Sequence, residues 1–182
     1  MACILYDCTN EFGVHEPVAC EDFPLGGIDA ILILHCGHSV TSASSESEID
    51  AAITAGLATL ITNIKATLPA ASPVLVTPPV GCSTDKVATY DRTLTWQDGN
   101  ISQVNNDNIY DPLAKGTPVD SVILYECAED RVTWSRPDKI MRGTATRTIP
   151  DNDNEFQIYE ASLSWRSLSL GTIAAAPPNI FT

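Results

Sequence analysis

Apolar and polar residues alternate in short runs along much of the chain, which predicts a protein built mainly of β-strands. In residues 88–97, for example, Leu94 and Trp96 fall on the opposite face from Thr95. Residues 28–35 form an apolar run of strand length, which indicates a buried strand. The further strands that we expect are residues 73–76, 121–127, 131–135, 139–149 and 155–168.

One segment has the periodicity of a helix. Its apolar residues recur at three- and four-residue steps and make a single stripe of Ile49, Ile53, Leu57, Leu60, Ile61, Ile64 and Leu68. Ser45 or a neighbouring serine can cap the start, acidic residues fill the first turn, and Pro69 closes the segment. The pattern therefore predicts one helix over residues 45–68. Gly56 weakens its middle, so the helix needs packing against a sheet.

About eight short strands and one helix predict an α+β protein dominated by antiparallel sheet. The simplest arrangement is a sandwich or a partly closed barrel with the helix flanking one side. We expect residues 1–27 to form an N-terminal arm, residues 28–170 a single β-rich domain, and residues 171–182 an extended C-terminal tail. Residues 104–116 are polar, which indicates a loop with one helical turn.

Charge is unevenly distributed along the chain. The net charge of −13 disfavours a protein that binds nucleic acid by neutralising phosphates. Carboxylates dominate the first 64 residues, because the first lysine or arginine is Lys65. The segment from Arg131 to Arg147 reverses this balance. One acidic and one basic region suit a contact in which one face of a subunit meets a different face of the next, although a solvated surface gives the same pattern.

The chain lacks the marks of membrane insertion or export. No apolar run approaches the roughly 20 residues that span a bilayer. The first residues carry no basic flank of the kind that precedes a signal peptide. We therefore expect a protein that acts where it is made or leaves the cell inside a larger assembly. In that setting the six cysteines are expected to be reduced and packed as small hydrophobic side chains.

The sharpest candidate for chemistry is the run His35-Cys36-Gly37-His38. Imidazole and thiolate are zinc ligands, and Cys8, His15 or Cys20 could complete a tetrahedron. Cys36 with His15 could also be read as a nucleophilic pair. We favour a structural role, since the chain contains no C-x-x-C pair, no phosphate-binding loop and no G-x-S-x-G motif. The sequence thus predicts no enzyme, no cofactor and no resident metal.

The chain resembles structural proteins of tailed-bacteriophage particles. It is rich in Thr, Ser, Asn and Asp, poor in Lys, and without a catalytic motif. Its order of elements resembles that of the tail-tube family, whose subunits pair β-sheets into a barrel-like sandwich with a flanking helix and close into stacked rings, usually hexameric. The resemblance implies that residues 28–35, 88–97, 121–127 and 155–166 form the sheets and that residues 45–68 form the flanking helix.

The same resemblance implies a self-assembling subunit of stacked tail-tube rings that conduct DNA. The partners would be copies of the chain and other virion proteins, with passive contact to phage DNA, no sequence-specific DNA binding and no membrane. The protein would be made in the host cytoplasm and reside in the virion. The expected inter-subunit contacts are Arg131, Arg136, Lys139, Arg142, Arg147, Asp107 and Asn108. A capsid decoration or head–tail connector protein is the alternative, and a small metal-binding module is a further one.

Overall fold

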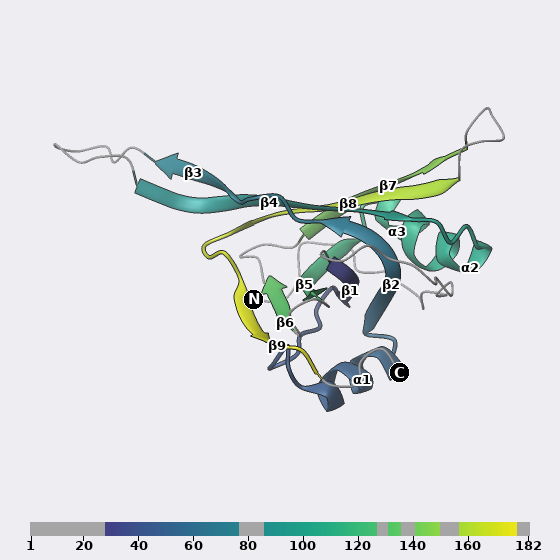
Figure 1. The fold of residues 1–182 in the computed structure, drawn as a ribbon, viewed down its shortest axis with the longest axis horizontal. Helices are drawn as coiled ribbons and strands as arrows, with labels where there is room; N and C mark the ends of the chain where they lie inside the picture. The colour runs from purple at the N-terminus through teal and green to yellow at the C-terminus, as the bar shows by residue number, and fades with distance from the viewer. Residues whose placement is uncertain (1–27, 77–85, 127–130, 136–140, 150–156, 178–182) are drawn as a thin grey trace.

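Two layers of antiparallel strands, joined at their corners, form the fold in the computed structural model (Figure 1). The structure describes residues 28–76, 86–126, 131–135, 141–149 and 157–177, without the side chains of Asp29, Lys86, Arg131 and Ser135. The upper layer in Figure 1 contains β3 (Ser72–Val76), β4 (Lys86–Asp98), β8 (Ile158–Ser167) and β7 (Met141–Thr148). The lower layer contains β2 (Ala58–Thr67), β1 (Ile28–His35), β5 (Pro118–Glu126), β6 (Arg131–Ser135) and β9 (Thr172–Ala175).

The pairings of six strands lead back to their starting point. They run β1–β2–β4–β8–β7–β5–β1, and every one is antiparallel. Two of the joints are narrow, because β2 and β4 share three residue pairs and β5 and β7 share two. The sheet therefore curls partly into a ring without becoming a regular barrel. This confirms the predicted class, an α+β fold dominated by antiparallel sheet.

A bend in β2 makes one of these corners. The first part of the strand pairs with β1, and Lys65 to Thr67 pair with β4 in the other layer. Between them the register shifts, and Asn63 adopts a positive φ of 57°. Asn is among the few residues other than glycine that tolerate this conformation. The bend lets one strand belong to both layers, as its curved ribbon in Figure 1 shows.

Buried side chains form two apolar clusters, one on each side of the lower layer. The larger lies between the layers and includes Ile31, Ile33, Leu94, Trp96, Leu124, Leu163 and Trp165. The smaller lies beneath the lower layer and includes Leu32, Leu34, Ile49, Ile123 and Val132. Successive residues of β1 thus enter different clusters, which explains why its sequence is apolar almost throughout.

The helix predicted over residues 45–68 is much shorter. Helix α1 spans Glu46–Thr54 and covers the outer side of the lower layer, seen at the bottom of Figure 1. Gly56 ends it with a φ of 69°, a conformation that costs glycine little. The remainder of the predicted helix is strand β2. The sequence ATLITNIKAT is rich in β-branched residues, and pairing with β1 and β4 decides its conformation.

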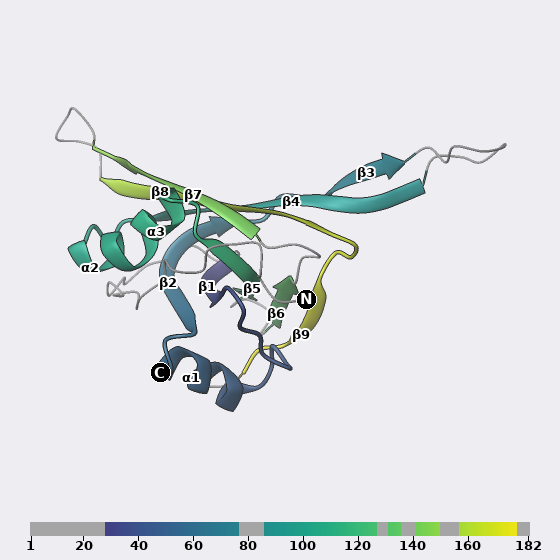
Figure 2. The same cartoon turned by 180° about the vertical axis from the view of Figure 1, so that it is seen from behind.

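Residues expected as a polar loop are largely helical. They form α2 (Gln103–Asn105), η1 (Asn106–Tyr110) and α3 (Asp111–Ala114). Ser102 caps the first turn, since its hydroxyl accepts a hydrogen bond from the Asn105 amide. Ile109 and Leu113 point into the core between the layers. Figure 2, the view from behind, shows these helices beneath β7 and β8, at the end of the molecule away from β3.

Candidate functional site

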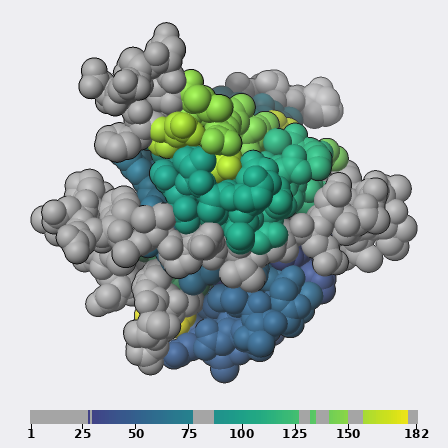
Figure 3. Space-filling model, turned by 90° about the vertical axis from the view of Figure 1, so that its right-hand side faces the viewer, coloured from purple at the N-terminus to yellow at the C-terminus, as the bar shows by residue number. Residues whose placement is uncertain are grey.

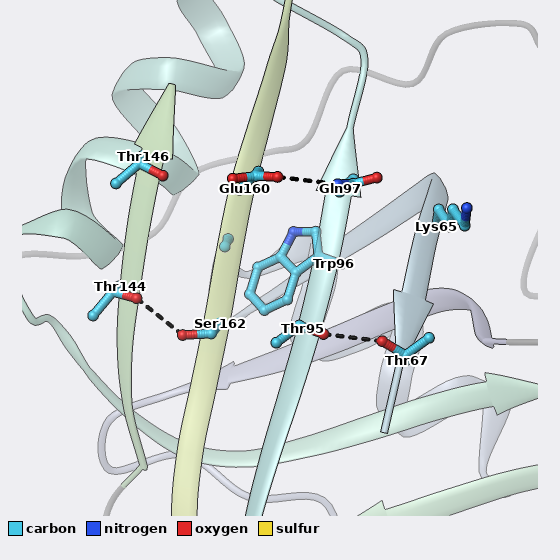
Figure 4. Close-up of a pocket in the computed structure, with 10 residues that line it drawn as sticks. Lys65, Thr67, Thr95, Trp96, Gln97, Thr144, Thr146, Glu160 and Ser162 are labelled. Atoms are coloured by element: carbon cyan, nitrogen blue, oxygen red, sulfur yellow. Dashed lines mark hydrogen bonds between the residues drawn. The ribbon is translucent and has the colours of Figure 1, made fainter. Parts of the chain in front are cut away.

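The outer face of the upper layer is a flat surface lined by hydroxyl groups (Figure 4). Threonines and serines on neighbouring strands form hydrogen-bonded pairs across it. The pairs are Thr67–Thr95 at 2.9 Å, Thr93–Ser164 at 3.1 Å and Thr144–Ser162 at 2.9 Å between hydroxyl oxygens. These hydroxyls satisfy one another, so few of the hydroxyl groups on the face are left to bind a ligand.

Charges of both signs lie on this flat face: Lys65, Arg142 and Arg166 are cationic, and Asp91 and Glu160 are anionic. Arg166 forms a bidentate ion pair with Asp91, with its Nε 2.6 Å from Oδ1 and its Nη2 3.0 Å from Oδ2. The arginine holds the pKa of the Asp91 carboxyl below its usual value by hydrogen bonding. Glu160 accepts a hydrogen bond from the Gln97 amide at 3.0 Å. Nothing in this arrangement resembles a pair of acid and base groups around a reacting atom.

A wide slot opens where the ribbon of β3 and β4 projects beyond the lower layer, on the left in Figure 1. Its volume is about 1260 Å³, and most of its lining is apolar. Pro73, Val87 and Tyr90 line it from the projecting ribbon. Leu170 lines it from the segment between β8 and β9, and Ile173 lines it from β9 itself. The slot therefore lies between the two layers, at the side where they separate.

Among the described residues that line this slot, Arg92 is the one cation. The Arg92 guanidinium donates a hydrogen bond to the carbonyl of Leu170. Its Nε is buried and has no hydrogen-bond partner among the described residues. Burial lowers the pKa of Arg92, although an arginine remains charged. Glu126 also lines the slot and accepts a hydrogen bond from the Thr133 hydroxyl at 2.9 Å.

Among the described residues, the strongly exposed large apolar side chains lie on two opposite sides of the folded molecule. On the left side of Figure 1 they are Leu75, Val76 and Val87 on the projecting β3–β4 ribbon, Leu168 and Leu170 between β8 and β9, and Ile173 on β9. At the right end they are Val104 on α2 and Ile149 just after β7. Figure 3 looks onto that right-hand end. Several exposed apolar side chains gathered on one surface, as on the left side of the molecule, are typical of surfaces for interaction.

A buried polar cluster fixes the right-hand end. Tyr110 stacks on Tyr159 with ring centroids 4.0 Å apart, and its hydroxyl donates to the Asp98 carboxylate at 2.5 Å. Burial, and then the charge of Asp98, raises the pKa of Tyr110 far above its usual value. Tyr110 therefore stays protonated as a donor. The Tyr159 hydroxyl donates to Asn106 at 3.2 Å, which joins the helical segment to β8.

The residues expected to make inter-subunit contacts are scattered. Arg131 begins β6 in the lower layer, and Arg142 lies on the flat face opposite Ser164. Arg147 donates to Gln157 at 2.8 Å and, like Asp107, lies close enough to Tyr159 to influence its pKa. Asp107 and Asn108 belong to η1 at the right-hand end. Arg136 and Lys139 lie outside the described residues. The expected basic segment thus supplies side chains to different surfaces.

The His35-Cys36-Gly37-His38 run does not supply a thiolate. Cys36 is disulfide-bonded, which corrects the expectation of a reduced thiol at this position. Sequence spacing could not show this, because a disulfide depends on a close approach in space. His35 Nε2 lies 3.0 Å from the Thr59 hydroxyl. The described residues contain no group of three His, Cys, Asp or Glu side chains placed to hold a metal ion, and Cys8, His15 and Cys20 lie outside them.

Sequence reasoning missed the two-ended distribution of exposed apolar side chains. Strand alternation predicts which side chains share a face, but it does not show which strands project beyond the layers. No family model, no curated protein and no solved structure matches the chain. Within the described ranges, no helix is both long and apolar enough to cross a membrane.

Proposed function

We propose that this protein is a self-assembling structural subunit of a tailed-bacteriophage particle and that it forms stacked tail-tube rings. The observation that carries the proposal is the pair of apolar ends. Leu170 and Ile173 are 56% and 66% exposed at one end, and Ile149 is 65% exposed at the other. A protein that acted alone would leave this apolar surface in water, whereas a repeated contact between subunits would remove it.

The sheet edges support the same proposal. β3 and β9 each pair along only one side with a described strand, β4 and β6 respectively. An open edge invites pairing with another chain unless the protein protects or uses it. Pro73 lacks an amide hydrogen and lies within β3, so that edge is partly protected against simple strand addition. Contacts made through side chains are therefore favoured at this end.

The flat face suits the wall of a channel through which DNA passes. Its hydroxyls are hydrogen-bonded in pairs, and Arg166 is neutralised by Asp91. The paired hydroxyls offer phosphates few donors, and the further cations of this face, Lys65 and Arg142, would give DNA passive contact that does not depend on its sequence. Glu46 and Glu48, by contrast, lie on α1, which is on the opposite side of the molecule from the flat face.

The disulfide at Cys36 also fits a virion protein. Disulfides persist in oxidising surroundings, which include the surface of a virus particle, and are rare in proteins that stay in the cytosol. A structural protein that is made in the cytoplasm and carried out of the cell in a particle would pass from the cytosol into the oxidising surroundings in which a disulfide persists.

Negative-stain electron microscopy of the purified protein over a concentration series, with size-exclusion chromatography beside it, tests the proposal. We expect rings or hollow tubes of uniform width. A protein that stays monomeric or trimeric but binds preformed capsids would instead be a decoration or connector protein. A monomer at every concentration that binds no capsid would refute the assembly function as a whole.

A further inference from the structure

We infer that residues 168–171 form a movable strap between the two layers and that Arg92 holds this strap in its closed position. The strap is the yellow segment that turns down from the end of β8 to the start of β9 in Figure 1. Two of its residues, Leu170 and Gly171, line the slot, so opening of the strap would uncover the slot on this side. The inference goes beyond the proposed function, because it concerns a single chain and holds whether or not copies assemble.

The two ends of the strap are fixed in different layers. Ser167, just before the strap, is buried and pairs with Tyr90 of β4 in the upper layer. Thr172, just after the strap, pairs with Trp134 of β6 in the lower layer. Four residues thus cross from one layer to the other without belonging to a strand. As long as both strand ends stay paired, movement of the crossing is confined to these four residues.

Few contacts other than that of Arg92 hold the strap. Leu168 and Leu170 are 67% and 56% exposed, so their side chains bury little apolar surface. The Ser169 carbonyl accepts a local hydrogen bond from the Ser167 hydroxyl at 2.6 Å. Among the described residues, the one hydrogen bond that reaches the strap from a distant part of the chain comes from Arg92, which donates to the Leu170 carbonyl. Segments with little apolar burial and few hydrogen bonds are the ones that open most readily.

Arg92 depends on this contact in a way that the arginine on the other face of the layer does not. Arg166 lies on the flat face and is paired with Asp91. Arg92 is half-buried, and burial lowers its pKa without an offsetting carboxylate among the described residues. Its Nε is buried without a hydrogen-bond partner in the same part of the chain. The Leu170 carbonyl is therefore the acceptor that compensates for the burial of this charge.

Gly171 provides the point at which the strap turns into β9. Its φ is 102°, in a region that residues with a side chain rarely adopt. A Cβ at this position would disfavour the closed path of the strap without altering Arg92. The closed position thus has two separate determinants, a hydrogen bond and a turn, and each can be changed by itself.

Cleavage of the native protein by thermolysin tests the strap, because this protease cuts before leucine and needs a segment that has left the surface. The protein is diluted until size-exclusion chromatography finds single subunits. Arg92→Met removes the donor but keeps an apolar stem, and circular dichroism checks the fold. Cleavage before Leu168 or Leu170, located by mass spectrometry, should become at least about tenfold faster, because a hydrogen bond from a charged donor is lost. Arg166→Met is the matched control and should be cut like the unaltered protein.

A second pair of variants decides the question if Arg92→Met does not fold. Gly171→Ala should speed the same cleavage at least about fivefold, because its φ is costly for a residue with a Cβ. Gly99→Ala should not, since Gly99 has no such φ and a methyl group there would meet no atom within 4 Å. Unchanged cleavage in both Arg92→Met and Gly171→Ala would overturn the inference. Cleavage in Arg92→Met that is equally fast before Leu94 and Leu163 in the core would also overturn it, because Arg92 would then support the whole sheet.

Discussion

The burial of His35 predicts a loss of stability in mild acid. This histidine ends β1, is 5% exposed, and lies beside the Thr59 hydroxyl. Burial, and secondarily the neighbouring His38, lowers its pKa from 6.5 to about 4. The native protein therefore holds a neutral imidazole at pH values where the unfolded chain would bind a proton.

The sign and the size of this loss of stability follow from proton linkage. Between the folded and unfolded pKa values the unfolded state binds more protons, so the free energy of unfolding falls as the pH falls. The stability that depends on a neutral His35 is fully present above about pH 6.5, and it is lost progressively as the pH falls toward about 4. With one pKa unit worth about 1.4 kcal/mol, lowering the pH from about 8 to about 5 should cost about 2 kcal/mol of stability.

Urea unfolding followed by tryptophan fluorescence at a series of pH values measures this slope. In His35→Gln the pH-dependent part of the loss between about pH 8 and about pH 5 should largely disappear, even if the variant is less stable throughout. His38→Gln serves as the control and should keep most of the slope, since His38 is only the second cause of the shift. An unchanged slope in His35→Gln would refute the argument and assign the acid sensitivity to other groups.

Three further predictions concern packing, the buried polar cluster and the disulfide. A methyl group on Gly143 would lie 2.4 Å from Leu113 Cδ2 and 3.0 Å from the Ser162 carbonyl oxygen. Gly143→Ala should therefore cost about 1–3 kcal/mol in thermal or urea unfolding, and Leu113→Val in the same chain should recover part of that loss. Tyr110→Phe keeps the ring but removes the hydrogen bond to a buried carboxylate, at a cost of about 1.5–3 kcal/mol. Tyr159→Phe, whose hydroxyl bond is longer, should cost less in the same assay, and equal costs would contradict this ranking. Reduction by dithiothreitol should lower the melting temperature, whereas Cys36→Ser should melt lower at the outset and respond less.

The strand pattern was predictable because each strand keeps one face in the core. β1 and β6 begin and end at the predicted residues, and β4 and β8 differ from prediction by a few residues at their ends. In β8, for example, the buried Leu163 and Trp165 alternate with exposed Ser164 and Arg166. A period of two directly reports a sheet with one covered face, so local sequence was sufficient here.

The helix predicted over residues 45–68 is too long because the apolar stripe in the sequence continues beyond Thr54, where helix α1 ends. Ile61 and Ile64 fit a helical period after Ile49 and Ile53, yet they are core residues of a strand with a bend between them. Helix propensity marks Gly56 only as a weak point within the helix, whereas its positive φ ends the helix there. The pairing of β2 with two different strands is a long-range property that periodicity does not report.

The helical segment after β4 was hidden by its polar composition. Asn105 is fully buried although it is polar, and the Asp98 carboxylate is buried with it. Local signals were nevertheless present, because Ser102 is a favourable N-cap and Ile109 and Leu113 are spaced four residues apart. For this segment the helix cap is a better indicator of structure than the polar composition, and the segment carries the polar cluster that fixes one end of the molecule.

The surfaces that carry the proposed function follow from the lengths of strands relative to one another, which no local pattern encodes. β4 continues past its pairing with β8 to meet β3 at Lys86, so a ribbon extends beyond the core and leaves Leu75 and Val87 uncovered. The same two residues would be ordinary core positions if the lower layer were as long as the upper one. Because exposing them in water is unfavourable, the mismatch in length supports the proposed contact with a second subunit at this end.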